Sequence, residues 1–240
     1  MACVRTDDLG NGRSACVAKV GSVELKIVGS SSSAQKSYRL GLYVHGDGAG
    51  AHKSGSALKS MLPWLDAHDG LGVSVLAPNG CSWWQTPTYD CTSTTANGPD
   101  LAAANAAALF AAVDALTKAY DIQLDRIYYY GSSGGSIFLT DEWIPLQAQT
   151  FPGVFALMCG GSKPGRAFTW DVHAPAVRAT NPLFFTYGDQ DFLASDIEKA
   201  TSDFSANGFA VTKKVIPGAA HCAFDAHGEA MAIWQADSLR

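Results

Sequence analysis

The 240-residue sequence has no apolar run long enough to span a membrane and no excess of positive charge. A transmembrane helix needs about 20 consecutive, mainly apolar residues, so no membrane-spanning segment is predicted. The formal net charge is −5, which gives no electrostatic support for binding nucleic acid or an anionic membrane. Internal repeats and linker-like shifts in composition are also lacking. A chain of this length can fill one large or two small hydrophobic cores, and we expect a single domain over residues 1–240.

The six cysteines include no Cys-x-x-Cys pair, which argues against a zinc site or a redox motif. Their number is even, and Cys3 with Cys16 and Cys81 with Cys91 each enclose a polar, turn-rich loop. This pattern favours disulfides and an oxidising compartment, with free thiols in a cytosolic enzyme as the alternative. No signal peptide is visible after Met1. We therefore interpret Met1 as an added start residue on a mature domain that is secreted or periplasmic.

Apolar periodicity predicts how the chain is organised. Residues 1–37 are expected to hold an irregular lead-in over 1–14 and an antiparallel edge hairpin formed by 15–20 and 22–28. Strands and helices then alternate to the end of the chain. The predicted strands are 38–44, 72–77, 127–130, 154–158, 183–187 and 209–216, and the predicted helices are 53–68, 99–120, 136–147, 174–179, 192–206 and 224–238. This alternation predicts an α/β fold with a mainly parallel sheet and helices on both faces.

One stretch has the sequence context of a nucleophile elbow. Residues 126–137 read RIYYYGSSGGSI, a buried aromatic strand followed by Gly-x-Ser-x-Gly and a helix. A strand, a sharp glycine turn and a helix are the context in which this motif exposes a nucleophilic serine. Ser133 is at its centre, and the amide of Gly134 would face the carbonyl under attack. The alternative is a flexible Gly/Ser loop between two core elements.

A serine hydroxyl needs a base to accept its proton and a third group to orient that base. His221 follows the last predicted strand, at the sheet edge where the elbow ends, whereas His173 and His227 are expected to be structural. Asp191 follows the strand that ends at residue 187 and is the predicted acid. Asp189 is the alternative, although it is better placed to cap the turn.

The glycine-rich loop HGDGAG follows the strand at 38–44. It lacks the lysine spacing of a phosphate-binding P-loop. A hydrolase takes its second oxyanion-hole amide from the loop after an early strand, and glycines let that backbone approach the substrate. We expect this amide to be that of Asp47, with Gly48 as the alternative. His45 is interpreted as a structural residue that fixes the loop.

A long loop over residues 78–98 carries Trp83 and Trp84. Adjacent side chains on an extended chain cannot both face one core, so at least one is expected to be exposed. An exposed tryptophan there would suit a substrate platform, and simple packing is the alternative. The connector over 160–172, which holds Trp170, is too short for a large lid. We therefore expect an open cleft edged by Trp83, Trp84 and Trp170.

The segments GSSGG, HGDG, YGDQD and PGAAHC follow one another as they do in the α/β-hydrolase superfamily, and the chain resembles its serine esterases over residues 38–240. It is similar to secreted polyhydroxyalkanoate depolymerases and to feruloyl or acetyl-xylan esterases. The resemblance implies Ser133 as nucleophile, Asp191 as acid, His221 as base, and Asp47 with Gly134 as oxyanion hole. The sequence departs from the pattern at Asp47, where many relatives carry another residue, and it has no recognisable signature of one substrate.

The resemblance implies hydrolysis of a carboxylic ester through an acyl-enzyme, by a monomer that needs no metal or cofactor. An open aromatic cleft would suit an extended, polymeric or aryl ester. The alternatives are a non-catalytic binding protein on a hydrolase scaffold and a serine peptidase or amidase. Cys159 ends the strand after the elbow and Cys222 follows His221, so we predict a Cys159–Cys222 disulfide that holds the histidine loop.

Overall fold

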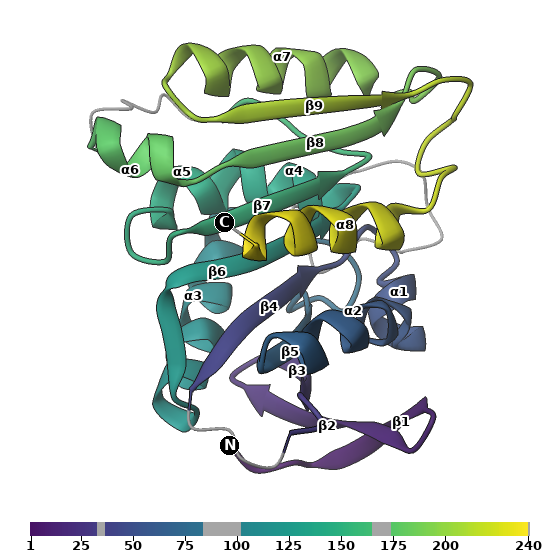
Figure 1. Ribbon diagram of the computed structural model, residues 1–240, viewed down its shortest axis with the longest axis vertical. Helices are drawn as coiled ribbons and strands as arrows, with labels where there is room; N and C mark the ends of the chain where they lie inside the picture. Colours follow the sequence, from purple (N-terminus) through teal and green to yellow (C-terminus); the bar gives the residue numbers. More distant parts are fainter. Residues whose placement is uncertain (33–36, 84–101, 165–173, 240) are drawn as a thin grey trace. The chain divides into compact units, whose positions relative to one another are not determined.

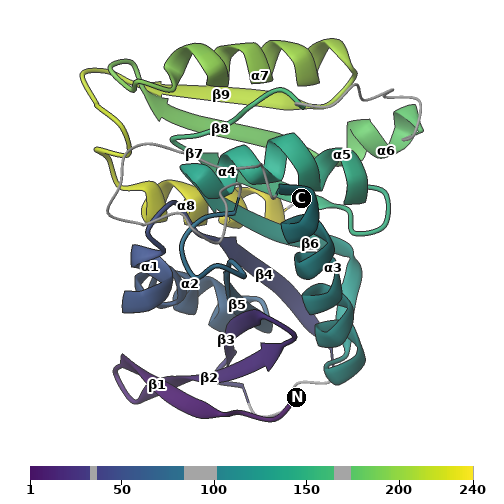
Figure 2. The same ribbon diagram turned by 180° about the vertical axis from the view of Figure 1, so that it is seen from behind.

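The computed structural model describes residues 1–32, 37–83, 102–164 and 174–239. Within it the chain forms two compact units, Met1–Leu124 and Asp125–Arg240 (Figures 1 and 2). Each unit has its own helices and strands, and they are described in turn. That residues 1–240 form a single domain stays a prediction.

The first unit is built on a mixed sheet with the strand order β1-β2-β3-β5-β4. Its strands are β1 (Arg5–Gly10), β2 (Arg13–Val20), β3 (Val23–Gly29), β4 (Tyr38–Val44) and β5 (Gly70–Leu76). The pairs β1–β2, β2–β3 and β3–β5 are antiparallel, and β4–β5 is parallel. The antiparallel hairpin predicted near the N-terminus is therefore confirmed.

The irregular lead-in predicted over residues 1–14 is wrong, because Arg5–Gly10 is strand β1. Its polar side chains gave no apolar alternation from which to predict a strand. In the structure Arg5 bonds Glu24 at 2.9 Å, and Lys26 Nζ lies 2.7 Å from Asp7 Oδ2. The predicted Cys3–Cys16 disulfide is present and ties the segment before β1 to β2.

The described residues of this unit form the helices α1 (Gly50–Ser54), α2 (Ser56–Ala67) and α3 (Ala102–Ala119). The helix predicted over 53–68 is divided at Gly55, whose left-handed backbone (φ 74°) ends α1 before α2 begins. The apolar residues predicted to share one face of this helix, Leu58, Met61 and Leu65, are fully buried. Helix α2 packs against β4 and β5, and α3 packs against β2 and β3.

The second unit is built on a parallel sheet with the strand order β6-β7-β8-β9. Its strands are β6 (Ile122–Ser132), β7 (Gly153–Met158), β8 (Leu183–Gly188) and β9 (Val211–Ile216). Its helices are α4 (Gly134–Phe138), α5 (Ile144–Gln147), α6 (Pro175–Thr180), α7 (Ala194–Ala206) and α8 (Ala226–Ser238), with a π-helical turn, η1 (Leu139–Trp143), between α4 and α5.

Helices cover both faces of the strands β6 to β9. Helix α8 packs against β7 and β8, and α7 packs against β8 and β9. Figure 1 shows α8 in front of the strands, and Figure 2, seen from behind, shows α4 and α5 in front. In the parts of the chain that the structure describes, no helix is both long and apolar enough to cross a bilayer. The α/β class, the antiparallel N-terminal strands and the parallel strands that follow agree with the prediction.

The register of the parallel strands brings their carboxyl ends to one edge. Ser132 of β6 pairs with Met158 of β7, and Gly188 of β8 pairs with Ile216 of β9. The segments that follow these strand ends carry the serine, aspartate and histidine singled out above. These three side chains are therefore expected near the carboxyl ends of the strands of the second unit.

Candidate active site

Ser133 lies in a sharp turn between β6 and α4. Its backbone has φ 49° and ψ −119°, a conformation that L-residues rarely adopt. A Cβ added to Gly131 would lie 2.9 Å from the Cα of Ser136 in the following helix, so glycine is required there. The Ser133 amide donates to the Met158 carbonyl at 2.9 Å, which continues the pairing of β6 with β7 into the turn. The geometry is that of the predicted elbow.

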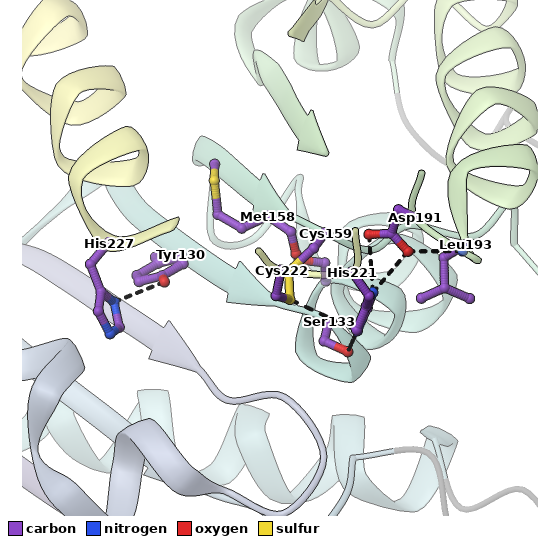
Figure 3. Close-up of a disulfide and its surroundings, with 10 residues drawn as sticks. Tyr130, Ser133, Met158, Cys159, Asp191, Leu193, His221, Cys222 and His227 are labelled. Atoms are coloured by element: carbon purple, nitrogen blue, oxygen red, sulfur yellow. Dashed lines mark hydrogen bonds and ion pairs between the residues drawn. A yellow bond between two sulfur atoms is a disulfide. The ribbon is translucent and has the colours of Figure 1, made fainter. Parts of the chain in front are cut away.

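Three side chains from distant parts of the sequence form one hydrogen-bonded series (Figure 3). Ser133 Oγ lies 2.9 Å from His221 Nε2, and His221 Nδ1 lies 2.8 Å and 3.0 Å from the two carboxylate oxygens of Asp191. A carboxylate only accepts hydrogen bonds, so the proton of the neutral imidazole is on Nδ1. His221 Nε2 is then the acceptor that faces the Ser133 hydroxyl.

The Asp191 carboxylate accepts hydrogen bonds from the backbone as well as from His221. Its side chain is completely buried, and Oδ1 also accepts the backbone N–H of Leu193 at 2.9 Å. The Asp191 amide donates to the carbonyl of Gly188, the last residue of β8, at 3.2 Å. A buried carboxylate fixed in this way can hold the imidazole in one orientation.

Asp189, the alternative acid, has a different partner. Its Oδ1 accepts the backbone N–H of Gly218 at 2.7 Å, in the loop that leads from β9 to His221. This is the turn-capping role considered in the sequence. Of the two aspartates, Asp191 is therefore the one in contact with the His221 ring.

The loops that carry Asp191 and His221 are joined through their backbones. The amide of Gln190 donates to the carbonyl of Ala219 at 3.0 Å. A Cβ added to Gly188 would overlap that carbonyl, so only glycine lets the two loops approach this closely. The loop contacts fix the imidazole and the carboxylate relative to each other.

His227, the other described histidine after Ser133, does not join this group. His227 lies in α8, and its Nδ1 is 2.9 Å from the hydroxyl of Tyr130 (Figure 3). Burial lowers the pKa of His227, which favours a neutral ring with a structural role. His173 lies outside the described residues.

The predicted Cys159–Cys222 disulfide is present, with its Cα atoms 5.2 Å apart. Cys159 immediately follows β7, and its amide donates to the Thr186 carbonyl of β8 at 2.8 Å. Cys222 immediately follows His221. The disulfide thus fastens the histidine loop to the sheet edge beside the elbow (Figure 3). Cys91, the predicted partner of Cys81, lies outside the described residues.

The predicted oxyanion-hole donors come from different units. Gly134 begins α4 directly after Ser133. In the first unit, the Gly48 amide donates to the Cys81 carbonyl at 3.0 Å, and Asp47 Oδ1 accepts from the Ser82 hydroxyl at 2.8 Å. The pairing of Asp47 with Gly134 around one oxygen stays a prediction.

His45 has the structural contacts expected of a residue that fixes this loop. The ring is completely buried, its Nδ1 donates to the Gly46 carbonyl at 2.7 Å, and its Nε2 accepts the Ala77 amide at 3.0 Å. Since Nε2 must accept, the ring has to be neutral. Burial lowers the pKa of His45 from 6.5 to about 3.

The His45 contacts predict a loss of stability in mild acid. Below pH 6.5 this histidine is protonated in the unfolded chain, whereas in the folded protein it stays neutral down to about pH 3. The free energy of unfolding therefore falls by up to about 1.4 kcal/mol for each pH unit between these two values. His45→Gln should be less stable than the wild type at pH 7 and should show a shallower decline toward pH 4. Thermal unfolding at a series of pH values measures both slopes, and equal slopes would contradict this account.

Of the three tryptophans predicted to edge a cleft, the structure describes only Trp83. Trp83 is completely buried, and its ring centroid lies 5.6 Å from that of His45. The platform interpretation is therefore wrong for Trp83, whose adjacency to a second tryptophan gave no indication of which ring turns inward. Trp84 and Trp170 lie outside the described residues.

Sequence reasoning missed one aromatic residue beside the imidazole. The ring centroid of Phe192 lies 4.4 Å from that of His221, although 76% of the residue is exposed to solvent. The available signal was its position directly after Asp191, but the apolar side chain was read as the start of the following helix.

Among the described residues no group of His, Cys, Asp and Glu side chains is arranged to hold a metal ion. The two carboxylates near the site, Asp189 and Asp191, are engaged with Gly218, Leu193 and His221. The chemistry that the described side chains offer is that of a hydroxyl facing an oriented base. Such a base can take the hydroxyl proton and create a nucleophile.

The sequence matches no protein-family model and no curated protein. Solved structures show the same fold. The chain is similar to a carboxylesterase from Mesorhizobium loti (15% identity, 92% of this chain and 98% of that one, TM-score 0.62) and to Est1E from Butyrivibrio proteoclasticus with ferulic acid bound (12% identity, 93% and 98%, TM-score 0.57). It also matches a thermostable esterase at 17% identity and a TM-score of 0.60, with 94% of this chain covering 60% of that one. The fold is that of the α/β hydrolases, as predicted.

Proposed function

We propose that this protein is a serine esterase that hydrolyses carboxylic esters through an acyl-enzyme. The observation that carries the proposal is the series from Ser133 Oγ to His221 Nε2 at 2.9 Å and from His221 Nδ1 to Asp191 at 2.8 Å. The strained elbow conformation of Ser133 adds support, because such strain persists where the surrounding structure enforces it, often at active sites. A binding protein would have no need of all three groups in contact.

The proposed reaction has two halves. His221 Nε2 takes the Ser133 proton as Oγ attacks the ester carbonyl, and the electron pair of the carbonyl moves onto its oxygen. Two amides, proposed to be those of Gly134 and Asp47, hold this oxyanion, each contributing about 3 kcal/mol of transition-state stabilisation. The imidazolium then protonates the leaving alcohol as the C–O bond breaks. Water repeats the sequence on the acyl-enzyme, releasing the acid and restoring Ser133.

The proposed substrate is an extended, polymeric or aryl ester, such as a polyester, a polyhydroxyalkanoate, or a feruloyl or acetyl ester of a polysaccharide. The esterases among the similar structures, one of them with ferulic acid bound, are consistent with an ester substrate. The disulfides Cys3–Cys16 and Cys159–Cys222 suit an oxidising compartment, which supports a secreted or periplasmic site of action. We further propose that the protein acts as a monomer and needs no cofactor.

The proposal is tested by a screen of p-nitrophenyl esters of increasing acyl length, beside a feruloyl ester and a polyester film. Hydrolysis of at least one class is expected, and Ser133→Ala, assayed alongside, should abolish it. A correctly folded protein that cleaves none of these esters would refute the esterase. Cleavage of p-nitroanilides faster than the matching p-nitrophenyl esters would instead favour the peptidase or amidase.

Removal of the disulfide beside His221 should impair catalysis as well as stability. In the chain-entropy view, a link across 63 residues is worth about 4 kcal/mol. In a Cys159→Ser, Cys222→Ser double variant we also expect kcat to fall about tenfold with little change in KM, because misplacing an oriented base reduces the rate of proton transfer. Thermal unfolding and steady-state kinetics measure the two effects.

The matched control removes the other described disulfide. A link across 13 residues, Cys3–Cys16, is worth about 3 kcal/mol in the same view. The Cys3→Ser, Cys16→Ser variant should lose stability but keep kcat when assayed well below its unfolding temperature. Equal losses of kcat in the two double variants would show that kcat falls because the whole protein is destabilised, and not because His221 is misplaced.

A further inference from the structure

Phe192 is an exposed aromatic residue held at a fixed place beside the proposed base. The residues on both sides of it are anchored, because Leu193 N–H donates to Asp191 Oδ1 at 2.9 Å and Ala194 N–H donates to the Asp191 carbonyl at 2.9 Å. Its ring centroid lies 4.4 Å from that of His221 at an interplanar angle of 43°. The Phe192 ring thus contacts the imidazole, while 76% of the residue remains exposed to solvent.

The proposed reaction fixes which part of an ester comes near this ring. His221 must protonate the leaving alcohol, so the alcohol oxygen has to come within about 3 Å of His221 Nε2. The carbonyl oxygen lies instead toward the Gly134 amide, on the far side of the bond that breaks. A group attached to the alcohol oxygen therefore lies next to the imidazole and within reach of the ring that packs against it.

We propose that Phe192 is a specificity-determining residue that binds the alcohol portion of the ester and selects apolar, especially aryl, alcohols. The inference rests on the proposed function and adds to it which half of the substrate is recognised. Burying an exposed aromatic face against a second ring is favourable both through apolar area and through ring–ring contact. A small alcohol such as methanol is too short to gain these contacts.

A different role for Phe192 would be to act through His221. An aromatic face beside a ring that becomes positively charged can stabilise the imidazolium. Such an effect would favour every ester alike, since the same imidazolium forms whichever alcohol leaves. The two roles are separated by asking whether the effect of a substitution depends on the alcohol.

The experiment compares wild type with Phe192→Ala on acetate esters of methanol, phenol and 2-naphthol. For each ester, kcat/KM of the wild type is divided by that of the variant, so that differences in the intrinsic reactivity of the esters cancel. We expect a loss of about tenfold or more on the aryl acetates and less than about twofold on methyl acetate. With phenol held constant and the acyl group lengthened from acetyl to octanoyl, the ratio should stay the same.

Matched variants separate this role from general damage. Phe192→Tyr should retain the aryl preference, and Leu146→Ala, which trims another exposed apolar residue of the same unit (40% exposed), should change no ratio. Thermal unfolding verifies that each variant folds. An equal loss on all three alcohols, or no loss on any, would overturn the assignment of Phe192.

Ser133→Ala is assayed in the same series. If wild type hydrolyses the acetates and Ser133→Ala does not, the proposed function stands whatever the outcome for Phe192. If Ser133-dependent hydrolysis is found neither for these acetates nor for any ester of the earlier screen, the proposed function fails and the assignment of Phe192 fails with it.

Discussion

Ser133→Ala is expected to reduce kcat by about 10⁶-fold, to the level that the remaining groups alone can supply. The substitution removes the only atom that would bond to the acyl group, while His221, Asp191 and the Gly134 amide stay in place. The backbone cost should not change, because alanine meets the same strain as serine at φ 49°. The loss is measured as kcat on a p-nitrophenyl ester that the wild type cleaves.

Ser132→Ala is the matched control within the same glycine turn. Ser132 is the last residue of β6, and none of the described contacts of His221 involves it. Its kcat should stay within about threefold of the wild type, and both variants should unfold near the wild-type temperature. A reversal, with Ser132→Ala inactive and Ser133→Ala active, would mean that the elbow presents the other serine.

Asp191→Asn is expected to reduce kcat by about 10⁴-fold while leaving the fold intact. The asparagine oxygen can keep the Leu193 bond, which turns its NH₂ group toward His221 Nδ1. Nδ1 must then accept, so the imidazole proton moves to Nε2, where the ring can no longer take the Ser133 proton. The variant should regain activity as pH rises if hydroxide replaces the lost base, and a pH–kcat profile records this.

Asp189→Asn provides the comparison, since Asp189 was the alternative acid. Its oxygen would still accept the Gly218 amide, so the loop that carries His221 should keep its shape. We expect kcat to fall by less than about threefold. If this substitution cost more activity than Asp191→Asn, the assignment of the two aspartates would have to be exchanged.

The residues at the ends of parallel strands were the most predictable part of the site. Ser133 and Asp191 follow strands whose apolar runs are plain in the sequence, and His221 follows the more polar strand β9. The carboxyl ends of parallel strands meet at one edge. The same reasoning paired Cys159 with Cys222. Local pattern and sheet geometry were therefore enough to bring these five residues together.

Side-chain placement away from strand ends was less predictable. Trp83 is buried against His45, a packing choice that adjacent tryptophans leave open in the sequence. Strand β1 carries polar side chains that form ion pairs with β3, a pattern that a search for apolar alternation does not detect. Phe192 was overlooked because its proposed role depends on a contact with His221, 29 positions further along the chain, that no local pattern encodes.

The most direct measurement is labelling with a fluorophosphonate, followed by mass spectrometry of the peptides. An activated serine attacks the phosphorus and retains the label, whereas an ordinary surface serine does not react. The account predicts a single adduct, on Ser133, that is lost in Ser133→Ala and strongly slowed in Asp191→Asn. A folded protein that takes up no label, or that carries it on another residue, would contradict the assignment of Ser133, Asp191 and His221 as one reacting group.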